Sequence, residues 1–125
     1  MIATAADRST IAARWSDETT TVVALCAAWC DTCTEFREAF ERIATARPEA
    51  LFVWLDIEDD AEICGDIDVE NFPTLAIYRG GALLHYGVSL PQEGAVARLV
   101  DEIGASAEPM ADAPVAVTAL PRALR

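Results

Sequence analysis

The pattern of apolar and polar residues in the first half of the chain predicts a strand–helix–strand unit. Residues 19–27 (TTTVVALCA) are β-branched and then continuously apolar, which is typical of a strand buried on both faces. Residues 31–46 place Phe36 and Phe40 on one helical face and charged side chains opposite, which predicts an amphipathic helix. Residues 50–57 (ALFVWLDI) then repeat the pattern of a buried strand.

The second half of the chain predicts a β-hairpin followed by a helix. Residues 74–78 and 82–86 have the pattern of short strands, and Arg79-Gly80-Gly81 between them is a turn signal. Residues 91–103 predict a helix that begins with proline, a residue that the first turn of a helix tolerates. Its valine, leucine and isoleucine positions form one apolar stripe.

Shorter segments complete the predicted order of elements. Residues 2–4 predict a marginal strand, residues 7–15 a short helix, and residues 59–65 a short acidic helix that ends at Gly65. A β-α-β unit favours parallel strands, whereas the strands of a hairpin must be antiparallel. The sequence therefore predicts an α/β fold, with a mixed central β-sheet flanked by helices on both faces.

The length of the chain and its last segment predict one domain followed by a tail. A chain of 125 residues is long enough to bury a single hydrophobic core. After Gly104 the sequence is rich in alanine and proline and shows no sustained period. We therefore expect residues 1–104 to form the domain and residues 105–125 a flexible tail, in which residues 115–120 (VAVTAL) are candidates for docking on an edge strand.

Charge and hydropathy exclude several classes of partner. The formal net charge is -12, which disfavours binding to nucleic acid and to anionic membrane surfaces. The longest apolar run, residues 22–30, is too short for a membrane-spanning helix, and the first residues do not resemble a secretory signal. We therefore expect a cytoplasmic location, where the four cysteines are more commonly free, catalytic or metal-bound than structural disulfides.

Cys30 and Cys33 lie in the motif WCDTC, where the first long strand ends and a helix begins. A helix N-terminus presents unpaired N–H groups and a partial positive charge, and both stabilise a thiolate. Cys33 follows within the first helical turn, which suits attack on a mixed disulfide formed at Cys30. The two residues by themselves are compatible with a redox couple, half of a zinc site or a structural pair. Their position between a strand and a helix favours the redox couple.

The remaining candidate residues have simpler interpretations. Cys26 lies within an apolar strand, so we interpret it as a small core residue, and Cys64 as an inert cysteine at a helix end. Neither belongs to a second CxxC arm, which disfavours a four-cysteine zinc site. His85 is predicted to be a surface or edge residue, and the acidic residues 56–62 a solvated helix start rather than a calcium loop.

The motif WCDTC after VVALCAA, together with the later NFPTLAIYRGGALLHYG, resembles the thioredoxin family over residues 2–103. The resemblance implies a thioredoxin fold and a protein-disulfide oxidoreductase that maintains cell redox balance. It implies that Cys30 is the attacking thiol and Cys33 the resolving thiol. It also implies protein disulfides as substrates and a flavin-dependent, thioredoxin-reductase-like electron donor, with no cofactor of the protein's own and no metal.

The resemblance also implies a substrate groove. The peptide bond before Pro73 is expected to be cis and to lie against the active-site disulfide. Phe72 and Pro73, with Trp29 and Gly87, are expected to hold an extended stretch of substrate by strand-like pairing. A proline that opens a strand fits this expectation, because it has no N–H to donate to a sheet.

The chain departs from the family pattern around the two cysteines. Asp31-Thr32 replaces the usual Gly-Pro, and Ala24 and Trp54 occupy the positions of a buried aspartate and a lysine. Asp31 places a negative charge beside Cys30, which disfavours the thiolate. We expect an altered potential and slower resolution, with Asp31, Glu35 or water transferring protons. The departures keep two alternatives open: a binding module that retains the groove with little redox turnover, and a small zinc-binding protein.

Overall fold

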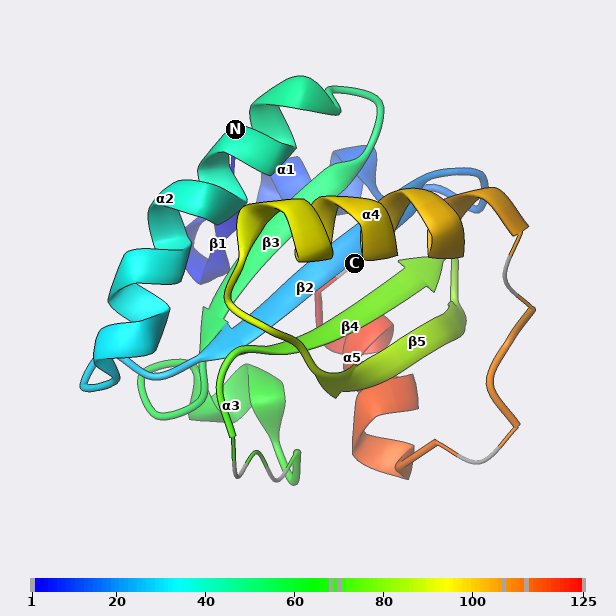
Figure 1. The fold of residues 1–125 in the computed structure, drawn as a ribbon. Helices are drawn as coiled ribbons and strands as arrows, with labels where there is room; N and C mark the ends of the chain where they lie inside the picture. Colours follow the sequence, from blue (N-terminus) through cyan, green and yellow to red (C-terminus); the bar gives the residue numbers. More distant parts are fainter. Residues whose placement is uncertain (1, 68, 70, 107, 112, 125) are drawn as a thin grey trace.

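The computed structural model describes residues 2–67, 69, 71–106, 108–111 and 113–124, without the side chain of Ser106 (Figure 1). The strands are β1 (Ala3–Thr4), β2 (Thr20–Cys26), β3 (Leu51–Asp56), β4 (Thr74–Arg79) and β5 (Ala82–Val88). The helices are η1 (Ala5–Asp7), α1 (Arg8–Arg14), α2 (Asp31–Ala46), α3 (Ala61–Cys64), α4 (Glu93–Ser106) and α5 (Val115–Leu124).

The strands form one mixed sheet in the order β1-β3-β2-β4-β5. β3 pairs with β1 and with β2 in parallel, whereas β2–β4 and β4–β5 are antiparallel. The predicted mixed sheet is therefore confirmed. β2 is the central strand, and its last residue, Cys26, is in register with Asp56 at the end of β3.

Helices cover both faces of the sheet, and each face has its own apolar cluster (Figure 1). Val22 and Ala24 of β2 pack in the cluster beneath α2 and α4. Val23 and Leu25 of the same strand pack in the opposite cluster, with residues of α1 and α5. Because side chains alternate along a strand, Cys26 lies on the α2 face.

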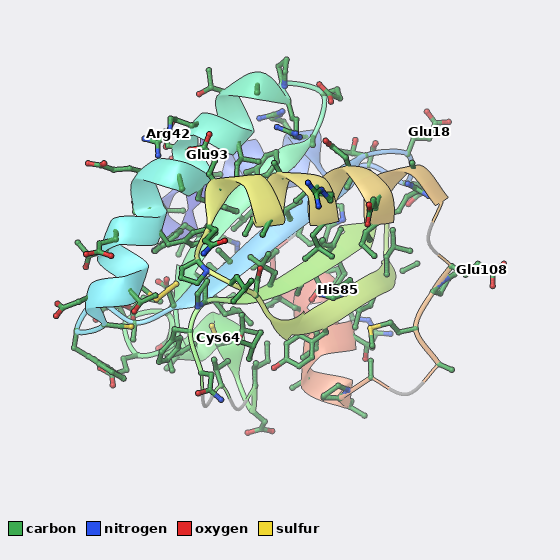
Figure 2. All side chains as sticks on the ribbon, viewed as in Figure 1. Glu18, Arg42, Cys64, His85, Glu93 and Glu108 are labelled. Atoms are coloured by element: carbon green, nitrogen blue, oxygen red, sulfur yellow. A yellow bond between two sulfur atoms is a disulfide. The ribbon has the colours of Figure 1, made fainter. Side chains whose placement is uncertain are left out.

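The amphipathic pattern of α2 explains why it forms as predicted. Its buried residues recur at helical spacing and face the sheet: Cys33, Phe36, Ala39, Phe40, Ile43 and Ala44. Ion pairs join the exposed sides of α2 and α4, one between Arg42 and Glu93 (Figure 2) and one between Arg47 and Asp101. The hydrogen bond from Arg47 lowers the pKa of Asp101. The Arg42–Glu93 pair is exposed on both sides, and such pairs contribute little stability.

The end of the chain corrects the prediction of a flexible tail. Val115–Leu124 forms helix α5, whose Val117, Leu120 and Leu124 are buried on the face opposite α2. Pro121, inside this helix, has no N–H with which to pair the Val117 carbonyl. The Tyr78 hydroxyl of β4 donates to that carbonyl instead, at 2.7 Å. The segment 115–120 therefore docks on a face of the sheet as a helix, not on its edge as a strand.

The hairpin between β4 and β5 requires its glycine. Gly80 has φ +57°, and a Cβ there would lie 2.9 Å from the Cα of Asp17. The Trp15 indole donates to the Gly80 carbonyl at 2.7 Å, which ties the turn to the end of α1. Within the described part of the chain, no helix is both long and apolar enough to span a bilayer.

Candidate active site

The structure joins Cys26 and Cys33 in a disulfide, with their Cα atoms 5.9 Å apart (Figure 2). Cys26 is the last residue of β2, and Cys33 lies in the first turn of α2. Both are buried, with exposed fractions of 1% and 2%. Cys26 is therefore buried as predicted for a core residue, and it is also bonded, because strand alternation directs it at the inner side of α2, where Cys33 lies.

Cys30 is a free, partly exposed cysteine at the N-cap position of α2. Its backbone N–H donates to the Ala27 carbonyl at 3.0 Å, and its own carbonyl accepts the Thr34 N–H at 3.1 Å. These bonds fix the backbone of Cys30 where the helix N–H groups face solvent. The structure thus brings the predicted pair into one helical turn, but bonds Cys33 to Cys26 instead of Cys30.

Trp29, the residue before Cys30, is held by contacts with Glu58 and Phe72. Its side chain is 63% exposed, and its indole N–H donates to a Glu58 carboxylate oxygen at 2.9 Å. Its ring meets that of Phe72 edge to face, with centroids 5.5 Å apart. The contact brings together two of the four residues predicted for the substrate groove.

Of the other two predicted groove residues, Pro73 immediately precedes β4 and Gly87 lies on β5, the strand that pairs with β4. The Phe72–Pro73 peptide bond is cis, the isomer that the resemblance implies. The Pro73 carbonyl accepts the Ser89 N–H at 3.0 Å, and Gly87 is in register with Leu75. Val88, next to Gly87, is exposed although apolar. Sequence reasoning missed Val88, because one apolar residue at a strand end gives no signal.

Asp56 is a site residue that sequence reasoning also missed. Its carboxylate accepts the Ala28 N–H at 2.6 Å and the N–H groups of Glu58 and Asp59 at 2.8 and 2.9 Å. It thereby ties the segment before Cys30 to the end of β3. The signal was available in the sequence, because a carboxylate at the end of a parallel strand lies at the same sheet edge as the cysteine motif.

A pocket of about 550 Å³ lies beside Cys33. Its lining includes Asp56, Asp59 and Asp60 on one side and Arg37 of α2 on the other. These carboxylates therefore share a pocket with the buried Cys33, although none occupies Ala24, the strand position where the family has an aspartate.

Apolar packing replaces the proton-transfer pair of the family. Ala24 is fully buried in the cluster beneath α2. Trp54 is partly buried, its ring lies 5.7 Å from that of Phe40, and the Arg37 guanidinium lies 4.9 Å over it. Hydrocarbon and a stacked cation therefore occupy the place where an aspartate–lysine pair is expected.

The residues between and after the two cysteines of the motif face outward. Asp31 and Glu35 are exposed on the first turns of α2, and Thr32 is partly exposed. Asp31 is the acidic residue of the first turn, where a negative charge favours the helix. The modulation of the cysteines by Asp31 and Thr32 therefore stays a prediction.

Cys64 packs in the apolar cluster on the face of the sheet opposite α2, and His85 lies on β5; both are labelled in Figure 2. Cys64 is buried on α3, and burial together with the nearby Asp60 and Asp56 raises its pKa to about 11. Its thiol is therefore protonated at neutral pH. His85 on β5 is partly buried, which lowers its pKa, and its Nε2 has no hydrogen-bond partner. Across the residues that the structure describes, no three His, Cys, Asp or Glu side chains gather as metal ligands.

Thioredoxins of several organisms are among the proteins similar to this chain. Thioredoxin of Ophiophagus hannah is 27% identical over 64 residues, which cover 51% of this chain and 61% of that protein. Thioredoxin-2 of Saccharomyces cerevisiae is 32% identical over 60 residues, which cover 48% and 58%. The chain thus matches less than two thirds of the length of these relatives.

The fold comparison agrees with the sequence comparison. The crystal structure of thioredoxin from Trypanosoma brucei brucei superposes with a TM-score of 0.67 at 24% identity, covering 82% of this chain and 90% of that one. This likeness confirms the predicted thioredoxin fold. The thioredoxin family model matches residues 4–102, most of the chain. The chain therefore belongs to the thioredoxin family.

Proposed function

We propose that this chain is a thiol–disulfide oxidoreductase that reduces or exchanges disulfide bonds of proteins. One observation carries the proposal: three cysteines meet at one strand–helix junction, with Cys33 in a disulfide and Cys30 as a free thiol at the helix start. Membership in the thioredoxin family supports it.

Cys30 is the attacking residue in this proposal and Cys33 the resolving residue. The Cys30 thiolate attacks one sulfur of a substrate disulfide, which forms a mixed disulfide and releases the first substrate thiolate. The Cys33 thiolate then attacks the sulfur of Cys30 and releases the second substrate thiolate. The exposure of Cys30 and the burial of Cys33 match this division of roles.

The substrate lies along the apolar surface formed by Trp29, Phe72, Pro73, Gly87 and Val88. Strand-like pairing next to Pro73 reads the substrate backbone rather than its sequence. A Cβ at Gly87 would make only an ordinary contact, 3.8 Å from the His85 ring. Packing within the chain therefore does not require glycine there, which supports a close approach by substrate.

A flavin-dependent, thioredoxin-reductase-like protein is the proposed electron donor, and the cytoplasm the proposed location. Both rest on the family and on the sequence. The net charge of -12 disfavours nucleic acid and anionic membranes as partners. The reduction potential of the cysteines, measured against glutathione, decides whether the protein reduces or oxidises its partners.

Insulin reduction with dithiothreitol as electron donor tests the proposed function. We expect Cys30→Ser to abolish the acceleration that the wild type produces, because no other cysteine of the site is exposed. Cys33→Ser is expected to accumulate a mixed disulfide between Cys30 and insulin, detected by mass spectrometry. Cys64→Ala is the matched control, because Cys64 is a buried cysteine outside the site.

The binding-module alternative predicts a different result. If the wild type and Cys30→Ser reduce insulin equally slowly, the oxidoreductase proposal is wrong. Retained binding of an extended peptide by both proteins would then favour a module that uses only the groove. Metal analysis of protein purified without chelator tests the zinc alternative.

A further inference from the structure

We propose that Cys26 is a third redox-active cysteine, and that Cys33 exchanges its disulfide partner between Cys30 and Cys26. The inference rests on the proposed function, and it gives the protein a second oxidised form besides the one with a Cys30–Cys33 disulfide. In this form the Cys26–Cys33 disulfide is buried and Cys30 is again a free thiol.

The packing of β2 against α2 places the third sulfur within reach. The Cα atoms of Cys26 and Cys33 are 5.9 Å apart, inside the range of about 4.4–6.8 Å that disulfides span. Hydrogen bonds tie the end of β2 and the segment after it to the end of β3. The Cys26 carbonyl accepts the Ile57 N–H at 2.9 Å, and the Asp56 carboxylate accepts the Ala28 N–H at 2.6 Å. Cys26 therefore reaches Cys33 without any rearrangement of the sheet.

The exchange step conserves atoms and electrons. After a substrate has been reduced, the Cys26 thiolate attacks the Cys33 sulfur of the Cys30–Cys33 disulfide. The Cys26–Cys33 bond forms, the Cys30–Cys33 bond breaks, and Cys30 leaves as a thiolate. The proton that Cys26 loses is balanced by the proton that Cys30 gains, so no oxidant or reductant is consumed.

The burial of the cysteines gives the two oxidised forms different properties. Cys26 and Cys33 are 1% and 2% exposed, so an external reductant has little direct access to the bond between them. Such a reductant acts after Cys30 has attacked Cys33 and restored the Cys30–Cys33 disulfide, which it can reach through the partly exposed Cys30. The free Cys30 of this form also attacks a second substrate disulfide, and the mixed disulfide persists because Cys33 remains bonded to Cys26.

A count of free thiols in the oxidised protein tests this inference. The full chain carrying Cys64→Ala is oxidised with one equivalent of diamide and then treated with dithionitrobenzoate. Under native conditions we expect one rapidly reacting thiol per chain, that of the partly exposed Cys30, whereas a Cys30–Cys33 bond would leave only the buried Cys26 thiol, which reacts slowly. The same chain with Cys26→Ala has none after oxidation, because Cys30 and Cys33 then have only each other. Far-UV circular dichroism checks that both variants fold.

Mass spectrometry assigns the bond. The oxidised protein is alkylated in the native state and cleaved before Asp31, which puts Cys33 on a different peptide from Cys26 and Cys30. Alkylation on Cys30, with Cys33 linked to Cys26, supports the exchange. In a quenched time course we expect the Cys30–Cys33 bond first and the Cys26–Cys33 bond later.

Two results overturn the proposals separately. If every oxidised molecule carries Cys30–Cys33 while insulin reduction still depends on Cys30, the third-cysteine inference is wrong and the proposed function stands. If the Cys26–Cys33 bond forms but Cys30→Ser reduces insulin as fast as the wild type, the proposed function is wrong and this bond has no part in exchange.

Discussion

The two faces of β2 are both apolar, but only one of them contributes a residue to the cysteine site. On one face, Val23 and Leu25 pack in a cluster that α5 closes. On the other face, Val22 and Ala24 pack beneath α2, but the next residue of the row, Cys26, forms a disulfide with Cys33. On the α5 face, β2 thus contributes only apolar packing. On the α2 face, it contributes apolar packing and also Cys26, a cysteine of the disulfide.

The covering helices explain the difference between these faces. α2 begins beside the end of β2, so its N-terminus and the partly exposed Cys30 lie where the sheet stops. α5 lies against the opposite cluster and buries Leu120 there. We therefore expect changes on the α5 face to alter stability alone, and changes at the start of α2 to alter exchange.

The largest expected effect on stability comes from Leu120→Ala on the α5 face. Leu120 is 1% exposed, and removal of a buried leucine side chain costs about 2–5 kcal/mol. The measurement is urea unfolding, with the initial rate of insulin reduction under native conditions unchanged. Val115→Ala on the same helix is the control, since Val115 is 82% exposed. Equal effects of the two changes would contradict the packing of α5.

Asp56→Ala tests the site end of the sheet. The carboxylate accepts three backbone N–H groups, and bonds to a charged group contribute about 1.5–3 kcal/mol. We expect a stability loss of that order and slower insulin reduction, because the segment before Cys30 loosens. Asp59→Ala changes the net charge equally and keeps these bonds to Asp56. A normal reduction rate in Asp56→Ala would show that Asp56 does not position Cys30.

A double-mutant cycle tests how α5 accommodates its proline. Tyr78→Phe leaves the buried Val117 carbonyl without its hydroxyl donor, which costs about 1–3 kcal/mol in urea unfolding. In a Pro121→Ala background the new N–H of residue 121 pairs with that carbonyl, so Tyr78→Phe is expected to cost less. Equal costs in both backgrounds would mean that the hydroxyl does not replace the missing helical bond.

The smallest expected effect is that of Asp31→Asn. Removal of the negative charge beside Cys30 is expected to raise the alkylation rate of Cys30 in the reduced protein about two- to five-fold. The increase should shrink as salt is added, because Asp31 is exposed. Glu38→Gln, also exposed on α2 but further from Cys30, should leave the rate unchanged. An equal rate in Asp31→Asn would exclude the local effect of this charge.

α2 and α5 show which elements the sequence could predict. The observed bounds of α2, Asp31–Ala46, are those that its spacing of aromatic and charged residues predicts. For α5 the sequence predicts part of a tail, because residues 105–125 are rich in alanine and proline and show no sustained period. Its helix depends on the distant Tyr78, which satisfies the carbonyl that the proline leaves unpaired.

The sequence by itself determined the mixed sheet, the strand–helix junction and the position of Cys30 at the helix start. These features follow from local periodicity and from residues that lie close together in the chain. Only the tertiary structure decided that Cys26 pairs with Cys33. Both faces of β2 are apolar, so its sequence cannot reveal which face each residue occupies, and the packing of α2 makes that choice.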